Sequence, residues 1–502
     1  MVLAVVFLVG FLTLIVMGYS FNLRELVGTG EVVERTGLVQ ISSVPTGATI
    51  YIDGEAPLLL STNASRTMLA GEHEISLAKG GFDGWNKKIT VTEGMMYRLN
   101  YPRIFKEERE PEEVVRFYKP YNVEDTLHKI DEGETVKTYA GEISFVTVSP
   151  NNDRMVLVLD GLFYMLNLND NKPELNWLEV PGKDGLSVVK ITTIESAEWS
   201  GNSERLLARV NGEWAIINVR DTKDTLWLDG LINVETLSDM KFESEVGDRL
   251  LVLDKTGDLT ELNARDKKLS EVLISGVERF DNDGDRIVYL TKEVESSAVD
   301  KLTEEQPKVD VEWQVRAYRV GENESYIVKR FELTGDEELG SVRLATMRYF
   351  QESYIGISRK DVFNVYSKTG WINGDESAEK ILDEKIGFVV KKLKKRGKGM
   401  VFELSDGDKS TKVFDIEAME LTDVDVKNSG WIDEYLRFRL EDGKLSVLDY
   451  DGLNERVLVE SGVSANRGVV IYGNSRWLYY FSRISNNENT DNREVLIREK
   501  IN

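Results

Sequence analysis

A repeating hairpin pattern, which begins near residue 143, constrains the fold of this chain more than any other feature. Each copy has an apolar strand, a turn rich in Ser, Asn, Asp and Gly, an acidic residue followed by arginine, and a second apolar strand. The arginines that open the second strands lie about 37 to 51 residues apart, as in propeller blades: Arg154, Arg205, Arg249 and Arg286. Because one blade cannot bury both of its faces alone, the repeat predicts a closed ring.

Later copies are less regular and begin near residues 347, 387, 431 and 469. The total of about eight predicts a seven- or eight-bladed β-propeller over residues 143–502, since propellers often split one blade between the two ends of the ring. The segments 148–153 (VSPNND) and 199–203 (WSGNS) resemble the TolB-like and WD-like propeller repeats. That resemblance implies the fold and does not indicate a function.

The chain opens on an apolar run, residues 1–17, with no charge and one polar residue, Thr13. The first charge is Arg24, so the run is long enough to cross a bilayer as a helix, with Tyr19 and Phe21 at the lipid–water boundary. We predict a single-pass transmembrane anchor over residues 1–23. A cleaved signal peptide and a buried core helix are the alternatives, but the run lacks a basic n-region, a clean cleavage site and any polar face. No Lys or Arg precedes it, so charge does not fix its orientation.

Residues 38–101 predict a small β domain, because alternating apolar residues are separated by turn signals such as Asp53-Gly54. The order of its motifs resembles the PEGA domain family, although Thr46 stands where the family pattern has Glu. The matching residues are Ser43, Pro45, Gly47, Ala48, Asp53, Gly54, Gly71, His73, Gly81, Phe82 and Trp85. The resemblance implies a non-catalytic extracytoplasmic stalk or surface-binding module. In that context His73 is expected to cap or pack within the sheet rather than bind a ligand.

The acidic, weakly periodic segment 102–142 reads as a linker that donates one strand to the propeller. The fold class is therefore mainly β: an anchor, a small β domain, a linker and a ring.

Composition excludes several kinds of chemistry. The chain has no cysteine and only two histidines, His73 and His128, neither in a catalytic or zinc-binding motif. A net charge of -24 is unsuited to nucleic acid. We therefore predict no cofactor, no metal and no enzymatic activity, while the 87 acidic residues leave carboxylate chemistry open.

Three further features have competing interpretations. The basic cluster is either a solvated turn, the interpretation we favour, or a contact for anionic lipid, teichoic acid or an acidic partner: Lys391, Lys392, Lys394, Lys395, Arg396 and Lys398. The acidic run 281–285 (DNDGD) fits a repeated hairpin turn better than a calcium loop, because the required Glu is missing. The insertion 295–311 predicts a mobile loop that interrupts a blade.

These features together predict a bacterial cell-envelope protein, tethered to the membrane, whose propeller is an extracytoplasmic platform for a protein or an envelope polymer. The alternatives are a polysaccharide-acting enzyme with carboxylates in the propeller channel, and a passive surface-layer or wall-associated structural protein.

Overall fold

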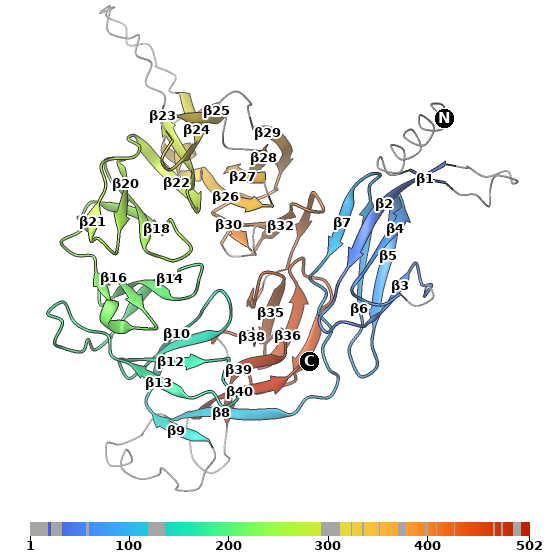
Figure 1. Cartoon of the computed structure of the whole chain (residues 1–502), viewed down its shortest axis with the longest axis horizontal. Coiled ribbons are helices and arrows are strands. Elements are labelled where there is room, and N and C mark those ends of the chain that lie inside the picture. The colour runs from blue at the N-terminus through green and yellow to red at the C-terminus, as the bar shows by residue number, and fades with distance from the viewer. Residues whose placement is uncertain are drawn as a thin grey trace, which may run out of the picture.

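The computed structural model describes residues 19–21, 33–56, 60–118, 136–292, 312–322, 324–333, 336–350, 352–369, 378–396, 400–407, 409–425, 427–464, 467–472, 475–484 and 493–502. In these ranges a small β module of two sheets lies against a ring of eight sheets (Figure 1). The short helices η3 (Thr222–Asp224) and α2 (Asp336–Ser341) lie within connections of the ring.

The small β module is built from seven strands in two sheets. One sheet has the order β1-β2-β4, with β7 parallel to β2, and the other has the order β3-β5-β6. The strands are β1 (Tyr19–Phe21), β2 (Val33–Ile41), β3 (Thr49–Ile52), β4 (Ala64–Leu69), β5 (Gly71–Ala78), β6 (Trp85–Val91) and β7 (Met96–Leu99). Alternating side chains of both sheets, among them Val39, Ile50 and Ile75, meet in one core.

The structure corrects two predictions at this end of the chain. Residues 1–18 and 22–32, which include most of the predicted anchor, lie outside the described residues, but Tyr19–Phe21, assigned above to the helix, forms β1 and pairs with residues 33–35 of β2. Among the helices that the structure describes, none has the length and apolar character needed to span a bilayer. Strand β4 was also not predicted, because half of its residues, ASRTML, are polar and most of them are exposed.

The ring contains eight sheets, which we call blades 1 to 8 in chain order. Blades 1 to 4 are β10 (Ile143–Val148), β11 (Arg154–Leu159), β12 (Leu162–Asn167), β13 (Leu175–Leu178); β14 (Ile194–Trp199), β15 (Arg205–Val210), β16 (Glu213–Asn218), β17 (Leu226–Trp227); β18 (Leu237–Phe242), β19 (Arg249–Asp254), β20 (Leu259–Asn263), β21 (Lys268–Leu269); and β22 (Val277–Asp283), β23 (Arg286–Lys292), β24 (Glu312–Arg319), β25 (Ser325–Glu332).

Blades 5 to 7 are β26 (Arg343–Tyr349), β27 (Glu352–Arg359), β28 (Val362–Thr369), β29 (Glu379–Lys385); β30 (Lys392–Arg396), β31 (Val401–Ser405), β32 (Thr411–Asp415), β33 (Glu420–Asp423); and β34 (Ser429–Trp431), β35 (Leu436–Glu441), β36 (Lys444–Asp449), β37 (Arg456–Val459). Blade 8 combines β38 (Val470–Tyr472), β39 (Trp477–Ile484) and β40 (Arg493–Lys500) with β8 (Pro111–Tyr118) and β9 (Lys137–Ala140).

Blade 8 closes the ring with strands from both ends of the propeller segment. Strand β8 leaves the β module, runs along the outer edge and pairs antiparallel with β40 (Figure 1). Its buried Val115 and Phe117 join Tyr479 of blade 8 and Leu157 of blade 1 in a single apolar cluster. The strand predicted in the linker is therefore present, and it completes the eighth unit rather than reducing the number of blades to seven.

Candidate functional site

The β module is docked on blades 6 and 7 through its Trp85 and Lys87. The indole Nε1 of Trp85 donates to Asp449 Oδ2 at 2.7 Å, and the Lys87 ammonium binds Asp451 Oδ2 at 2.7 Å. All four of these side chains are buried, and the core of the module continues into residues of both blades, such as Val401 of blade 6. The module and the ring therefore share one core, in contrast to two domains joined by a linker.

Aromatic rings and backbone contacts extend this interface. Tyr101 packs edge-on against both Trp85 and Tyr450, and it stacks on Tyr435 with ring centroids 5.9 Å apart. Asn454 accepts a hydrogen bond from the Asn86 backbone N–H and donates to the Asn86 carbonyl. These contacts fix the register of β6 against blade 7.

Two carboxyl groups in this interface are held away from water. Burial, with the neighbouring Asp451 charge, raises the pKa of Asp449 to about 7, although Arg456 and the Trp85 hydrogen bond oppose the shift. Burial likewise raises the pKa of Glu417 to about 7, with Arg98 3.6 Å away. Since Asp449 Oδ1 has no hydrogen-bond partner among the described residues, this interface carries an electrostatic cost at neutral pH.

The motif residues that suggested a PEGA resemblance fall into two groups. His73 bridges the Asp53 carboxylate at 2.8 Å and the Leu69 carbonyl at 2.9 Å, so it fastens β5 to the turn after β3, as expected for a structural histidine. Pro45, Gly47, Ala48, Gly54, Gly71, Gly81 and Phe82 lie in or beside the turns of the module. Trp85 alone among them reaches the ring, a role that its motif does not indicate.

A polar cleft opens where the module meets blade 7. It has a volume of about 460 Å³ and is lined by Asp83, Gly84, Asn86, Asn454, Glu455, Arg456 and Val457. Most of its polar groups are already paired: Asn86 with Asn454, and Glu455 with Arg439 at 2.6 Å.

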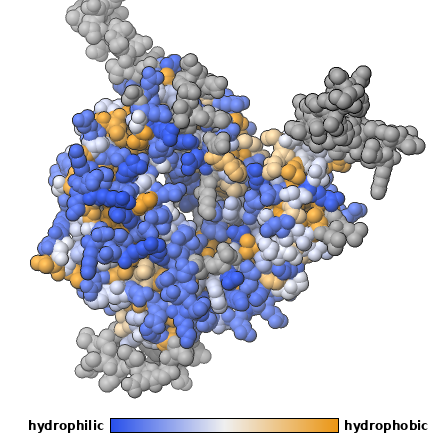
Figure 2. Space-filling model, viewed as in Figure 1, coloured by the Kyte–Doolittle hydropathy of each residue, from blue (hydrophilic) through white to orange (hydrophobic). Residues whose placement is uncertain are grey.

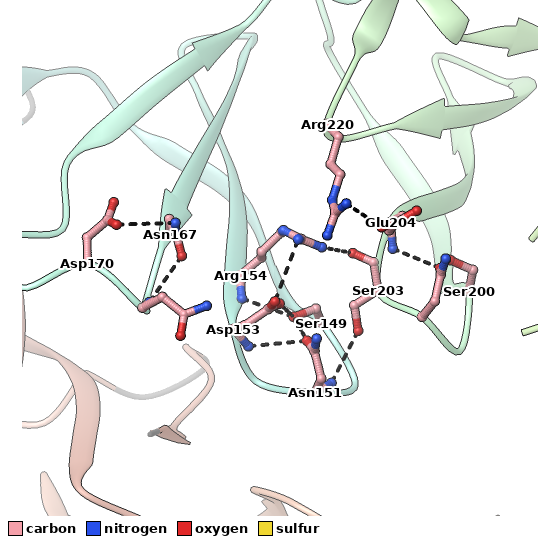
Figure 3. Close-up of polar contacts among 12 residues, drawn as sticks. Ser149, Asn151, Asp153, Arg154, Asn167, Asp170, Ser200, Ser203, Glu204 and Arg220 are labelled. Atoms are coloured by element: carbon pink, nitrogen blue, oxygen red, sulfur yellow. Dashed lines mark hydrogen bonds and ion pairs between the residues drawn. The ribbon is translucent and has the colours of Figure 1, made fainter. Parts of the chain in front are cut away.

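The turns between the first and second strands of blades 1 and 2 are linked to each other. In blade 1, Ser149 Oγ accepts from the Arg154 backbone N–H and donates to Asn151, while the Asn151 N–H donates to Ser203 Oγ of blade 2 (Figure 3). The Arg154 guanidinium donates to the Ser203 carbonyl of blade 2. Arg154 thus ties its own blade to the next, and Arg286 does the same through Ser353 of blade 5. Arg249 instead pairs with Glu243 and Glu261 of its own blade.

Replacing Arg154 with glutamine is expected to lower the free energy of unfolding by about 1.5–3 kcal/mol, since a charged donor in a largely buried position is lost. Arg220 is the matched control in the same view: it is 60% exposed and pairs with Glu204, so Arg220→Gln should cost less than about 1 kcal/mol (Figure 3). Urea unfolding of the two variants measures the difference, and equal effects would contradict the linking role of Arg154.

The innermost strands of the blades surround a polar channel, and the surface is hollowed and mostly hydrophilic at the centre of the ring (Figure 2). In blades 1 to 4 these strands carry a bulge at the same place, which re-aims the residues that follow. Three of those residues form a charge ladder across blades 2, 3 and 4: Glu198, Lys241 and Asp281. Lys241 Nζ lies 2.7 Å from Asp281 Oδ1, and Asp281 Oδ2 accepts from the Thr346 N–H of blade 5.

Glu198 is exposed to water in this channel, yet protein surrounds it. That enclosure raises the pKa of Glu198, while Lys241 and Lys395 act in the opposite direction. Lys395 belongs to blade 6, on the far side of an eight-bladed ring from blade 2, so the carboxylate of Glu198 faces cations across the channel.

The basic cluster is not the solvated turn that we favoured. Lys392, Lys394, Lys395 and Arg396 form β30, the innermost strand of blade 6, and Lys391 precedes it. Lys398 lies outside the described residues. The period-2 pattern was hidden because both faces of this strand carry charges, with only Leu393 buried.

The acidic run 281–285 is a strand end and a hairpin turn, as the sequence indicated. Its carboxylates have separate partners: Asp281 binds Lys241, and Asp285 binds Arg319 at 2.7 Å. Within the described ranges no group of three or more His, Cys, Asp or Glu residues is arranged to hold a metal ion. The insertion 295–311 lies outside the described residues, between the paired strands β23 and β24.

Comparison with known protein families identifies the module. Residues 36–104 match the PEGA domain. No curated protein sequence matches the chain.

Similar solved structures are β-propeller-like. They include PorZ, a surface component of the type-IX secretion system of Porphyromonas gingivalis (14% identity, TM-score 0.36, 69% of this chain and 42% of PorZ), dipeptidyl peptidase 4 of P. gingivalis (12%, 0.41, 67% and 56%) and the C-terminal WD40 domain of Sif2 (11%, 0.39, 78% and 97%). The chain thus spans less than half the length of PorZ. At such low TM-scores these likenesses add nothing to the ring that its own strand pairing defines.

Proposed function

We propose that this chain is a non-enzymatic scaffold of the bacterial cell envelope, tethered to the membrane by its N-terminal apolar segment. The PEGA domain holds the propeller on the extracytoplasmic side, and the propeller binds a protein or an envelope polymer. Passive wall association and carboxylate catalysis in the channel are the competing functions.

The docking of the PEGA domain on blades 6 and 7 is the observation that carries this proposal. A domain that served only as a flexible spacer would have no need of a buried ion pair, such as Lys87–Asp451, with the domain it spaces. The rigid attachment orients the ring relative to the chain segment before β2. A fixed orientation is useful when the ring must present one face to a partner beside a membrane.

The arrangement of charges in the channel also favours binding over catalysis. Lys241 lies between the carboxylates of Glu198 and Asp281 and neutralises part of their charge. Two glycosidase carboxylates instead need a gap between them that is open to the sugar and to water.

Protease treatment of intact cells tests the placement of the propeller. When protease is added outside intact cells, we expect the full-length protein detected by an antibody against the propeller to disappear, while a cytoplasmic marker stays intact. Protection of the propeller in intact cells, followed by cleavage after lysis, would refute the extracytoplasmic placement.

Cross-linking followed by purification from detergent-solubilised membranes tests the binding role. We expect a stoichiometric protein or polymer to co-purify with the full chain. Regular surface labelling without any such component would favour a passive structural role, and hydrolysis of an envelope glycan that is abolished by Glu198→Gln would favour the enzyme.

A further inference from the structure

The charges of β30 alternate in a way that gathers three cations on one face. Lys392, Lys394 and Arg396 are two residues apart, so they share the face of the strand that lies toward blade 7. Arg396 Nε is 2.8 Å from Glu403 Oε2 on the neighbouring strand β31. From blade 7, Arg437 reaches the same carboxylate at 3.2 Å. We call Lys392, Lys394, Arg396 and Arg437 the channel cation cluster.

One carboxylate binds both arginines of this cluster. Glu403 accepts from Arg396, from Arg437 and from the Trp431 indole at 3.0 Å. Burial alone would raise the pKa of Glu403, but the arginines outweigh it and hold that pKa below its usual value. Glu403 therefore stays ionised and neutralises one of the cations around it.

No carboxylate among the described residues is in direct contact with Lys394. This lysine lies opposite Glu403 in the strand register, but none of its contacts with described residues is an ion pair or a hydrogen bond. Enclosure by protein, followed by repulsion from Arg396, lowers the pKa of Lys394. The Glu403 carboxylate and, to a smaller extent, Glu198 across the channel oppose that shift. An anion beside Lys394 would relieve this repulsion.

Arg437 supplies a second unused donor in the same wall. Its side chain is only 3% exposed, and its Nε has no hydrogen-bond partner among the described residues. The guanidinium lies over the Trp431 ring, 4.7 Å from the centroid, so its plane is held in one orientation. A buried donor without an acceptor destabilises the folded chain, and an oxygen atom of a bound anion would provide the missing acceptor.

We propose that the channel cation cluster is an oxyanion-binding site, which takes a carboxylate or phosphate group of a ligand that enters the propeller channel. Lys394 and Lys392 supply mobile ammonium donors at the open side, and Arg396 and Arg437 supply the fixed charge behind them. In a chain of net charge -24, this local excess of cations selects anionic groups that the rest of the surface repels. The site deepens the proposed function by naming the chemistry of the partner, and it rests on that function only for its biological role.

Calorimetric titration of the purified full chain at low salt tests the site, with inorganic phosphate and a tetraglutamate peptide as separate probes. We expect saturable one-to-one binding, and the tighter of the two probes identifies whether phosphate or carboxylate is the natural group. Lys394→Gln should weaken binding about tenfold or more, because a charge-assisted contact is lost. Lys392→Gln should weaken it to a smaller extent.

Lys444→Gln is the matched control, since Lys444 is a partly exposed lysine on β36, paired with Glu460, outside the innermost strands. It should bind both probes as the unaltered chain does. Absence of saturable binding of either probe at millimolar concentration would overturn the proposal, as would equal affinities of the Lys394→Gln and Lys444→Gln variants. Because these measurements do not depend on a membrane or a partner, their failure is distinguishable from failure of the scaffold function.

Discussion

Replacing Trp85 with alanine is expected to lower the free energy of unfolding by about 3–5 kcal/mol, because a large buried aromatic side chain is removed from a core that cannot collapse around the gap. Trp85 is 1% exposed and belongs to the cluster shared by the β module and blades 6 and 7. The variant also removes the Nε1 donor of Asp449, which leaves that buried carboxyl with fewer partners. Docking of the module should weaken together with stability.

Two further variants separate these effects. Trp85→Phe keeps most of the apolar contact but loses the hydrogen bond, so its cost should be intermediate. Trp177→Ala removes the same side chain from β13, where it is 49% exposed, and should cost less than about 1 kcal/mol. Urea unfolding and limited proteolysis between the module and the ring provide the measurements. A cost for Trp85→Ala as small as that for Trp177→Ala would show that the module is not docked as described.

The first half of the ring was predictable because its local signals agree. Each of blades 1 to 4 begins with a strand, a Ser- or Asp-containing turn and an arginine, and the structure gives these residues hydrogen-bonding roles, such as Ser149 with Arg154. Blades 5 to 8 keep the sheet but not the turn chemistry, so their boundaries were located only approximately. The number of blades was ambiguous, because sequence spacing does not reveal that β8 completes the unit that ends the chain.

The docking surface was predictable only in one detail. In β6 the buried face runs Trp85, Lys87, Ile89 and Val91, so a lysine falls on an apolar face. A lysine at such a position needs a buried counter-ion. That counter-ion, Asp451, is 364 residues away, in a segment whose sequence is typical of an ordinary turn. Long-range pairing of this kind has no local signal. The channel cations were found as a cluster in the sequence but assigned to the wrong structure, because a strand charged on both faces has no period-2 hydrophobic pattern.

The second prediction concerns Asp449, the buried acid at the docking surface. Asp449→Asn should raise the free energy of unfolding at pH 8 and have little effect, or the opposite one, at pH 5. In the folded chain the pKa of Asp449 is raised from 3.8 to about 7, so the folded state holds a proton that the unfolded state has already lost. The contribution of Asp449 to the free energy of unfolding therefore falls as the pH rises from about 4 to 7 and is constant above that range. The total decrease is at most about 4 kcal/mol.

The amide that Asp449→Asn introduces would keep an acceptor for Trp85 and Asn454 at the Oδ2 position and remove the buried charge. Asp451→Asn, two residues away, is the matched control, and it should change the free energy of unfolding in the opposite direction. It leaves the Lys87 ammonium buried without its counter-ion, so it should cost about 3–5 kcal/mol at both pH values. Urea unfolding at pH 5 and pH 8 measures both variants. If Asp449→Asn destabilised the chain equally at the two pH values, Asp449 would be an ordinary ionised hydrogen-bond acceptor; the predicted pattern would instead show that the chain tolerates a strained carboxylate at neutral pH in order to hold the PEGA domain in place.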